Sequence, residues 1–385
     1  MDTCWCGNQK FSKYSSQYNK CVRCNTLVVK KDINGNPAEV HDDENDLYGK
    51  TYWEVKMVSK ADKNSLDEVV DLYIGERCIY WLKHLFHYIL PGEGSVAEVG
   101  CGLGQFAYCL KYAGYDQLAF ELSPEICAYI YKTLGIAIEN SELKDEGRMY
   151  KAVAAFDVLE HLRDPKGFLQ TVSSVLEEDG ILFFQTPCYD PKLTEEDMLR
   201  EKPRFQEQMI ENEHLFLFSR ESVKKLLSLY GYEYVEFMPA FFGDDYDMFF
   251  AASRKPLKHY PDEEIRRALN QQPGGRLIRA LISSWDKARD YERQILYQNE
   301  HLQNRLGQIE ELTRMVHEAQ KQVADRDRQI EGLTRMVHEA QKHLDSRESQ
   351  IEELTRMVHE AQKHLDSRES QIEELTRMVR EEQKH

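Results

Sequence analysis

The chain has 385 residues, of which 41% are hydrophobic and 30% are charged, and its formal net charge is -17. This length gives room for about two domains, and the high charged fraction indicates that part of the chain is not globular. The negative charge argues against nucleic acid as a partner, because phosphate binding needs a basic surface.

The chain begins with no basic leader followed by an apolar stretch, and it contains no apolar run of membrane-spanning length. We therefore expect a cytoplasmic protein, in which cysteines are reduced. Five of the nine cysteines lie in mostly apolar surroundings and are expected to be small core residues. They are Cys78, Cys101, Cys109, Cys127 and Cys188.

Residues 1–40 hold the other four cysteines as two close pairs, Cys4-x-Cys6 and Cys21-x-x-Cys24, on either side of a short β-like stretch. Four thiolates at these spacings can surround Zn²⁺ tetrahedrally, as in zinc ribbons, although the first pair is shorter than is usual. Without a metal, so short and polar a segment could hardly fold. We expect a structural zinc with no open position for chemistry. Reduced, unliganded thiols are the alternative.

Residues 41–255 show the pattern of an α/β domain. A helical pattern covers about residues 66–90, and short apolar runs then alternate with helical patterns, which indicates a parallel sheet. Five runs are predicted as successive strands: SVAEVG, DQLAFELS, IAIE, AVAAFDVL and GILFFQTP. The last two runs, YEYVEFMPA and DMFFAAS, are separated by too few residues for a crossover helix. They should form an antiparallel hairpin at the end of the sheet.

The loop after the first of these strands reads EVGCGLGQF, with glycines at 100, 102 and 104. A dinucleotide site would need a third glycine one residue later, and a phosphate loop would need Gly-Lys-Ser/Thr. The acidic residue in the loop, Glu98, suits a cationic ligand with hydroxyl groups better than a pyrophosphate.

This loop resembles the first motif of class I S-adenosylmethionine-dependent methyltransferases. Glu121, in LAFELSP, resembles the family's acidic residue that accepts hydrogen bonds from both ribose hydroxyls. FDVLEHLRDP (156–165) is similar to the fourth-strand motif, and the terminal hairpin is similar to the end of that fold. The resemblance implies a Rossmann-like fold over roughly residues 1–255 and S-adenosylmethionine as cofactor. The cofactor-binding residues that it implies are Glu98, Gly100, Gly102, Gly104, Gln105, Glu121 and Phe156.

Two histidines are candidates for the general base that a sugar hydroxyl would need as methyl acceptor. His161 follows the fourth strand and should lie at its carboxyl edge, and His214 follows a polar stretch (191–212) that could cover the site. A structural role that shapes the loop is the alternative for each. Softer candidates for substrate contact are Tyr189, Tyr246 and Asp247. The acidic turn 244–247 could hold a cation but is expected to be a solvated turn, and the sequence assigns no catalytic metal and leaves open whether a divalent metal assists catalysis.

Residues 256–287 are predicted to be a linker, with a hinge at Pro-Gly-Gly 273–275, and residues 288–385 a parallel coiled coil. The coil consists of 21-residue repeats, each three heptads long, with apolar residues at the a and d positions. One arginine per repeat occupies a d position (Arg326, Arg347 and Arg368). The pattern leaves two and three strands open.

A methyltransferase with a long parallel coil resembles the enzymes that terminate bacterial O-antigen chains, a step of lipopolysaccharide biosynthesis. This architectural resemblance implies a glycan acceptor, a homotrimer, and a place near the inner membrane beside a membrane-associated polymerase. Two other functions stay open: a C- or N-methyltransferase for a nucleotide-linked sugar, and a non-catalytic coiled-coil scaffold.

Overall fold

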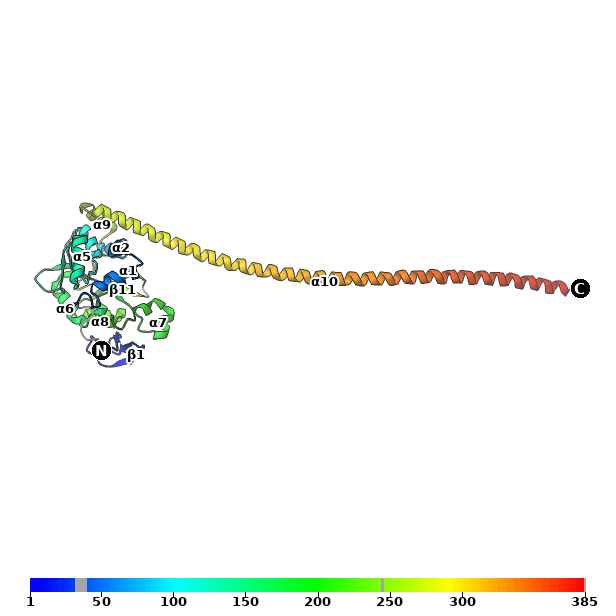
Figure 1. Ribbon diagram of the computed structural model, residues 1–385, viewed down its shortest axis with the longest axis horizontal. Helices are drawn as coiled ribbons and strands as arrows, with labels where there is room; N and C mark the ends of the chain where they lie inside the picture. Colours follow the sequence, from blue (N-terminus) through cyan, green and yellow to red (C-terminus); the bar gives the residue numbers. More distant parts are fainter. Residues whose placement is uncertain (32–39, 244–245, 384–385) are drawn as a thin grey trace. The chain divides into compact units, whose positions relative to one another are not determined.

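The computed structural model describes residues 1–31, 40–243 and 246–383. The first half of the acidic turn 244–247 lies outside these residues. The chain divides into two compact units, Met1–Tyr291 and Glu292–His385. The last helix, α10 (Gly275–Glu382), begins in the first unit and makes up the described part of the second (Figure 1).

A seven-stranded sheet with the order β10-β11-β8-β7-β4-β5-β6 forms the centre of the first unit. Its strands are β4 (Ser95–Val99), β5 (Asp116–Phe120), β6 (Ile138–Glu139), β7 (Tyr150–Phe156), β8 (Leu176–Pro187), β10 (Tyr234–Met238) and β11 (Asp247–Ser253). β4 to β8 run parallel, whereas β11 is antiparallel to β8 and to β10. The predicted five strands and the terminal hairpin are confirmed, and with them the Rossmann-like sheet.

Both faces of this sheet are buried. In β7, Ala152 and Ala154 pack on one face and Val153 and Ala155 on the other, because successive side chains of a strand point in opposite directions. The helical segments of the unit are η1 (Tyr52–Met57), α1 (Val58–Lys60), α2 (Leu66–Tyr73), η2 (Ile74–Cys78), α3 (Ile79–Phe86), α4 (Gln105–Tyr112), α5 (Pro124–Leu134), η3 (Leu159–His161), α6 (Pro165–Val175), α7 (Glu195–Glu201), η4 (Pro203–Gln208), α8 (Arg220–Ser228) and α9 (Asp262–Gln271). Helices α3, α4 and α9 cover the first face, and α6 and α8 cover the second.

The stretch 191–212, expected to be a long polar loop, contains α7 and η4 instead. Thr194 caps α7 by accepting a hydrogen bond from the amide of Asp197, and three acidic residues occupy its first turn. Both features stabilise the amino end of a helix, and together they account for the difference from the expectation.

A second, four-stranded antiparallel sheet has the order β1-β2-β3-β9. The amino-terminal head supplies β1 (Phe11–Lys13), β2 (Tyr18–Cys21) and β3 (Leu27–Val29), and β9 (Phe216–Leu217) follows His214. Leu27 pairs with Leu217 and Val28 with Phe216. The head is therefore built into the unit through a strand that begins two residues after a candidate catalytic histidine.

The segment predicted as a linker, residues 256–287, contains α9 and the first turns of α10, and Ile265, Leu269 and Ile278 are buried in the core. The expected hinge glycines are tightly packed. A Cβ on Gly275 would lie 1.6 Å from the carbonyl oxygen of Leu269. Close packing explains this glycine, and the structure places a helix start at Gly275 instead of a flexible joint.

In its described part, residues 292–383, the second unit is a helix with no core of its own. Its Ile, Leu and Val side chains at the predicted a and d positions are more than half exposed, among them Ile309 (58%), Leu312 (59%) and Val316 (55%). A row of exposed apolar side chains of this length is characteristic of a surface that another chain covers. The parallel coiled coil itself stays a prediction.

Candidate active site

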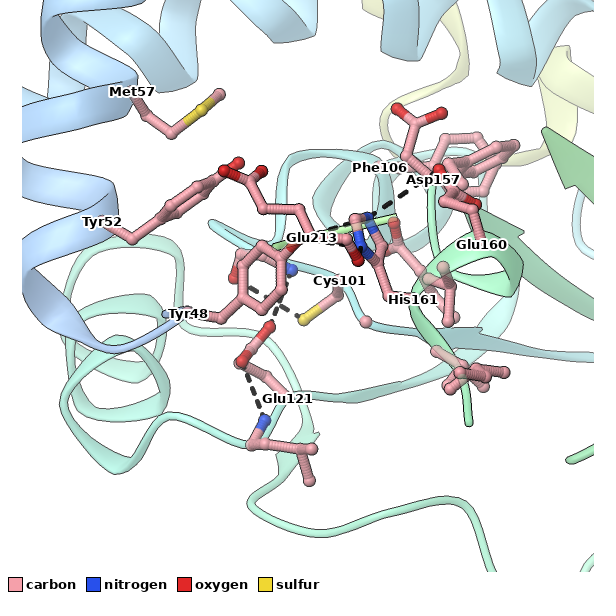
Figure 2. Close-up of a pocket in the computed structure, with 18 of the residues that line it drawn as sticks. Tyr48, Tyr52, Met57, Cys101, Phe106, Glu121, Asp157, Glu160, His161 and Glu213 are labelled. Carbon is pink, nitrogen blue, oxygen red and sulfur yellow. Dashed lines mark hydrogen bonds and ion pairs between the residues drawn. The ribbon is translucent and has the colours of Figure 1, made fainter. Parts of the chain in front are cut away.

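A cavity of about 770 Å³ lies at the carboxyl ends of β4, β5 and β7. In open α/β sheets ligands bind at this edge, where neighbouring connections leave in opposite directions. The cavity is lined by the glycine loop and by residues from η1, η3 and the stretch 204–214 (Figure 2). It thus brings together most of the site residues predicted from the sequence.

The glycine loop lies close against its surroundings. Gly102 has a φ of 55°, and a Cβ there would lie 2.5 Å from the ring of Trp53. Gly104, with a φ of 75°, is the residue before α4 and has left-handed backbone geometry that favours glycine. Gly100 also lines the cavity. The loop therefore exposes backbone where a side chain would fill the space.

Glu121 is fixed at the end of β5 by backbone amides. Its Oε2 accepts a hydrogen bond from Gly102 N at 3.0 Å, and its Oε1 accepts from Leu122 N at 2.8 Å and from Ser123 N at 3.1 Å. Burial raises the pKa of this carboxyl to about 7, although the three amides oppose the shift. The carboxylate therefore lies beside the glycine loop, as predicted for a group that binds a diol.

Glu98 and Gln105 carry buried polar atoms that have no hydrogen-bond partner among the described residues, Oε2 of the former and Nε2 of the latter. Burial raises the pKa of Glu98 to about 8. Unpaired buried polar atoms are unfavourable in a folded protein, and a polar ligand would remove that cost. Together with the glycine loop and Glu121, they fit S-adenosylmethionine, which offers an ammonium group and a ribose diol.

Phe156 lies at the cavity but is mainly a core residue. Its ring stacks on Trp81 with centroids 3.8 Å apart and an angle of 5°. Phe106 meets it edge-on at 5.0 Å. The predicted cofactor contact of Phe156 stays a prediction, and the stack shows that the side chain also holds β7 against α3 and α4.

His161 and His214 lie together although 53 positions separate them, with ring centroids 4.8 Å apart. His161 Nδ1 is 2.8 Å from the carbonyl oxygen of Glu213, and His214 Nδ1 is 2.6 Å from that of Gln208. Burial lowers the pKa of His161 to about 3 and that of His214 to about 4. Both imidazoles are therefore neutral near pH 7.

Sequence reasoning missed several groups around these histidines. Glu160 is fully buried, and its Oε2 accepts a hydrogen bond from Thr186 Oγ1 at 2.8 Å. Asp157 begins the same turn with a φ of 57°, which is unusual for a residue other than glycine. Tyr48 Oη lies 2.9 Å from His161 Nδ1 and 3.2 Å from Nε2. The signal for the first two was present in DVLEH, where only the histidine was selected.

The less strongly indicated candidates for substrate contact separate into two groups. Tyr246 lines the cavity, with the Arg204 guanidinium 4.5 Å from its ring centroid. Tyr189 is fully buried and donates a hydrogen bond to the carbonyl oxygen of Asn25 in the head, which accounts for it as a structural residue. Asp247 is buried at the start of β11 and does not line this cavity.

The four cysteines of the head converge. Sγ of Cys4 lies 3.5 Å from that of Cys24, and Sγ of Cys6 lies 3.6 Å from that of Cys21. All four sulfur atoms lie within 4.8 Å of one another. Zinc–sulfur bonds of about 2.3 Å in a tetrahedron put sulfur atoms about 3.8 Å apart, so this donor set fits Zn²⁺. The other five cysteines are buried and unpaired, as expected for core residues.

Comparison with known proteins supports the chemistry of this site. Residues 72–237 match the family profile described as "Methyltransferase domain". The chain contains a methyltransferase domain. The match spans the glycine loop, Glu121 and His161, and the protein is an S-adenosylmethionine-dependent methyltransferase, as the sequence predicted. No curated protein matches the chain.

Solved structures similar to the chain include other methyltransferases. Magnesium protoporphyrin IX methyltransferase from Synechocystis is 16% identical, with a TM-score of 0.34, over 49% of this chain and 82% of that one. A putative methyltransferase from Bacillus halodurans is 13% identical, with a TM-score of 0.37, over 46% of this chain and 99% of that one. At these values the two likenesses add nothing about what this domain methylates.

Among the described residues, no helix is both long enough and apolar enough to cross a membrane.

Proposed function

We propose that this methyltransferase transfers a methyl group to a sugar hydroxyl, and that it thereby caps a growing bacterial surface polysaccharide such as O-antigen and ends its elongation. The observation that supports a sugar acceptor is the composition of the cavity. Beyond the cofactor residues it is lined by aromatic rings (Tyr48, Tyr52, Phe241, Phe242 and Tyr246). Ionisable side chains are interleaved with these rings (Asp157, Glu160, His161, Arg204 and Glu213). Rings that pack on a sugar, beside groups that bind its hydroxyls, suit a carbohydrate.

The cofactor would be held by residues whose polar atoms already point to the cavity. Glu121 would accept the ribose hydroxyls, the backbone of the glycine loop would approach the amino-acid part, and Glu98 and Gln105 would pair with its polar groups. When bound, S-adenosylmethionine supplies an electrophilic methyl group on a sulfonium. Gly100 and Gly102 line the cavity and leave the room that this requires, whereas Gly104 packs against Ile130 and Ile136.

The acceptor would approach from the side of His161 and His214. Transfer of the cofactor's methyl group to this hydroxyl, with the carbon–sulfur electron pair kept by sulfur, would release the hydroxyl proton, which a side chain must receive. His161, whose Nδ1 faces a carbonyl oxygen, would receive that proton at Nε2 once the Tyr48 hydroxyl, 3.2 Å away, gives way to the acceptor, and His214 is the second candidate. General-base catalysis of this kind contributes about 10²–10⁴-fold.

The head and the coil support this activity without taking part in it. The four cysteines of the head would bind one structural Zn²⁺. The heptads of residues 288–385 would form a parallel homo-oligomer, a trimer by resemblance or else a dimer, that acts as a spacer between the catalytic unit and a membrane-associated glycan polymerase. The rod would be about 150 Å long at about 1.5 Å per residue.

The acceptor class can be tested by methyl transfer from labelled cofactor onto a panel of cell glycans and sugar nucleotides. We expect label at the non-reducing end of a polysaccharide, and O-demethylation chemistry should release it. Label in a sugar nucleotide at carbon or nitrogen would instead identify a small-molecule methyltransferase. Failure to bind S-adenosylmethionine at all would leave only a scaffold role.

A further inference from the structure

Three side chains at the acceptor end of the cavity bring their ligand atoms to one point. Glu160, His161 and His214 each offer one donor atom, and these atoms lie within 4.8 Å of one another. All three side chains are buried, with exposed fractions of 1%, 7% and 6%. Figure 2 shows Glu160 and His161 side by side on the turn that follows β7. His214 reaches them from the segment before β9.

The hydrogen bonds of the two histidines define which ring nitrogen is available. His161 Nδ1 lies against the carbonyl oxygen of Glu213, and His214 Nδ1 against that of Gln208. Because a carbonyl oxygen only accepts, each Nδ1 carries the hydrogen and each Nε2 keeps a lone pair. Histidines that bind metal ions are held in this way, with the other ring N–H donated to a carbonyl or carboxylate.

The Glu160 carboxylate is the second observation that points to a bound cation. Glu160 Oε2 accepts a hydrogen bond from Thr186, but Oε1 is buried and has no hydrogen-bond partner within residues 1–31, 40–243 and 246–383. This oxygen lies 3.8 Å from His161 Nε2, too far for a hydrogen bond. An unpaired buried carboxylate oxygen facing two imidazole lone pairs is unfavourable, and a cation between them would remove that cost. Asp157, three residues earlier, lines the same cavity.

We propose that Glu160, His161 and His214 bind one divalent cation at the acceptor end of the cavity. Two imidazoles and a carboxylate suit the first-row ions Mn²⁺, Fe²⁺ and Co²⁺, and three protein ligands leave positions open for substrate oxygen. The sequence alone assigned no catalytic metal, and this proposal goes beyond it. Tyr48, whose hydroxyl lies 3.2 Å from His161 Nε2, would move aside or become a further ligand.

The ion deepens the function proposed above and rests on it. It would hold the acceptor hydroxyl and stabilise the charge on its oxygen while the hydroxyl proton passes to water. That oxygen then forms the bond to the methyl carbon, and the sulfur keeps the electron pair of the broken bond. His161 would thus act as a ligand of the ion, and the ion would carry out the activation otherwise assigned to a free base.

The test is a Mn²⁺ titration followed by electron paramagnetic resonance, on the full chain with its zinc retained and no acceptor present. We expect one bound Mn²⁺ per chain. Glu160→Gln and His214→Gln should each weaken Mn²⁺ binding at least about tenfold. His84→Gln is the matched control, because His84 packs between Tyr80 and Phe249 outside this cavity. It should bind Mn²⁺ as the unmodified chain does.

Calorimetry with S-adenosylmethionine shows whether each variant is folded, since none of these residues belongs to the cofactor end. Absence of Mn²⁺ binding in the unmodified chain, or equal binding in His214→Gln, would overturn the site. Methyl transfer that persists undiminished after the ion is removed would overturn its role in the reaction. If instead Mn²⁺ binds as expected and no sugar is methylated, the metal site stands and the proposed acceptor is wrong.

Discussion

The two units of this chain use their residues in opposite ways. In Met1–Tyr291, single residues have roles that no neighbour could take over: Gly102 fits against Trp53, and Glu121 receives three amide hydrogens. In Glu292–His385, the repeats 330–350 and 351–371 differ at one position. The first unit is specified residue by residue and the second by its period. Single substitutions should therefore impair the first unit, whereas the second should tolerate any change that preserves whole heptads.

The largest effect is expected from the head. Cys21→Ser removes one of four thiolates, so zinc binding should be lost, and the apparent binding energy of structural zinc is about 10–16 kcal/mol in isolated fingers. The head should unfold, and because β3 pairs with β9, residues near His214 should lose protection too. Metal analysis and hydrogen exchange would show both changes. Cys109→Ser, a buried core cysteine remote from the head, should keep its zinc.

Next in size are two substitutions within the cavity whose effects should differ in kind. His161→Ala should lower turnover roughly 10²–10⁴-fold and leave cofactor binding nearly intact. Glu121→Ala should weaken S-adenosylmethionine binding by about 1–3 kcal/mol, because charged hydrogen bonds are lost. Calorimetry and single-turnover assays measure the two quantities separately. If both variants lost cofactor binding equally, His161 would belong to the cofactor end.

A smaller effect concerns pH. Burial raises the pKa of Glu98 to about 8 and that of Glu121 to about 7, with Arg77 opposing the first shift and Asp43 adding to the second. A cationic cofactor binds best to ionised carboxylates, so its affinity should increase as pH rises from 6 to 7.5. The increase should be roughly tenfold, since one pKa unit corresponds to about 1.4 kcal/mol. In Glu121→Gln the slope of affinity against pH should be shallower, and an unchanged slope would remove Glu121 from the explanation.

The smallest effect on the enzyme itself is expected from the largest deletion. Removing residues 330–350 joins Gln329 to Ile351 in register, so oligomer and turnover should be unchanged while the rod shortens by about 31 Å. If the coil is a spacer, the surface polysaccharide should become shorter in gels, and duplicating the repeat should lengthen it. Deletion of Glu331–Thr334 breaks the heptad and should impair assembly instead. Identical gel profiles in the 21-residue deletion and duplication strains would exclude the spacer.

The sequence predicts local features of this molecule well, but it predicts contacts between segments that are distant in sequence poorly. The strands, the glycine loop and Glu121 follow from patterns within a few residues, and the structure confirms their arrangement. The contact of His161 with Tyr48 joins positions 113 apart, and no local pattern indicates it.

In the segment 256–287, a local pattern is present but predicts the wrong structure. Pro-Gly-Gly is typical of a flexible joint, yet Gly274 and Gly275 have no room for a Cβ beside Tyr112 and Leu269. Whether a glycine provides backbone flexibility or allows close packing depends on neighbours that are distant in sequence. Residues of α9 also become buried only because α3 and the sheet offer them an apolar face.

The pairing of Leu27 with Leu217 has a consequence for how the protein is made. A ribosome adds roughly 5–20 residues per second, so about 10–40 s separate the synthesis of the two partners. During that interval β3 has an open edge, and the three strands and four thiolates of the head must keep it ordered. Metal capture by the newborn head would then come first, and the strand that follows His214 would complete this sheet later. The order of synthesis makes the first residues of the chain a template for the strand that follows His214.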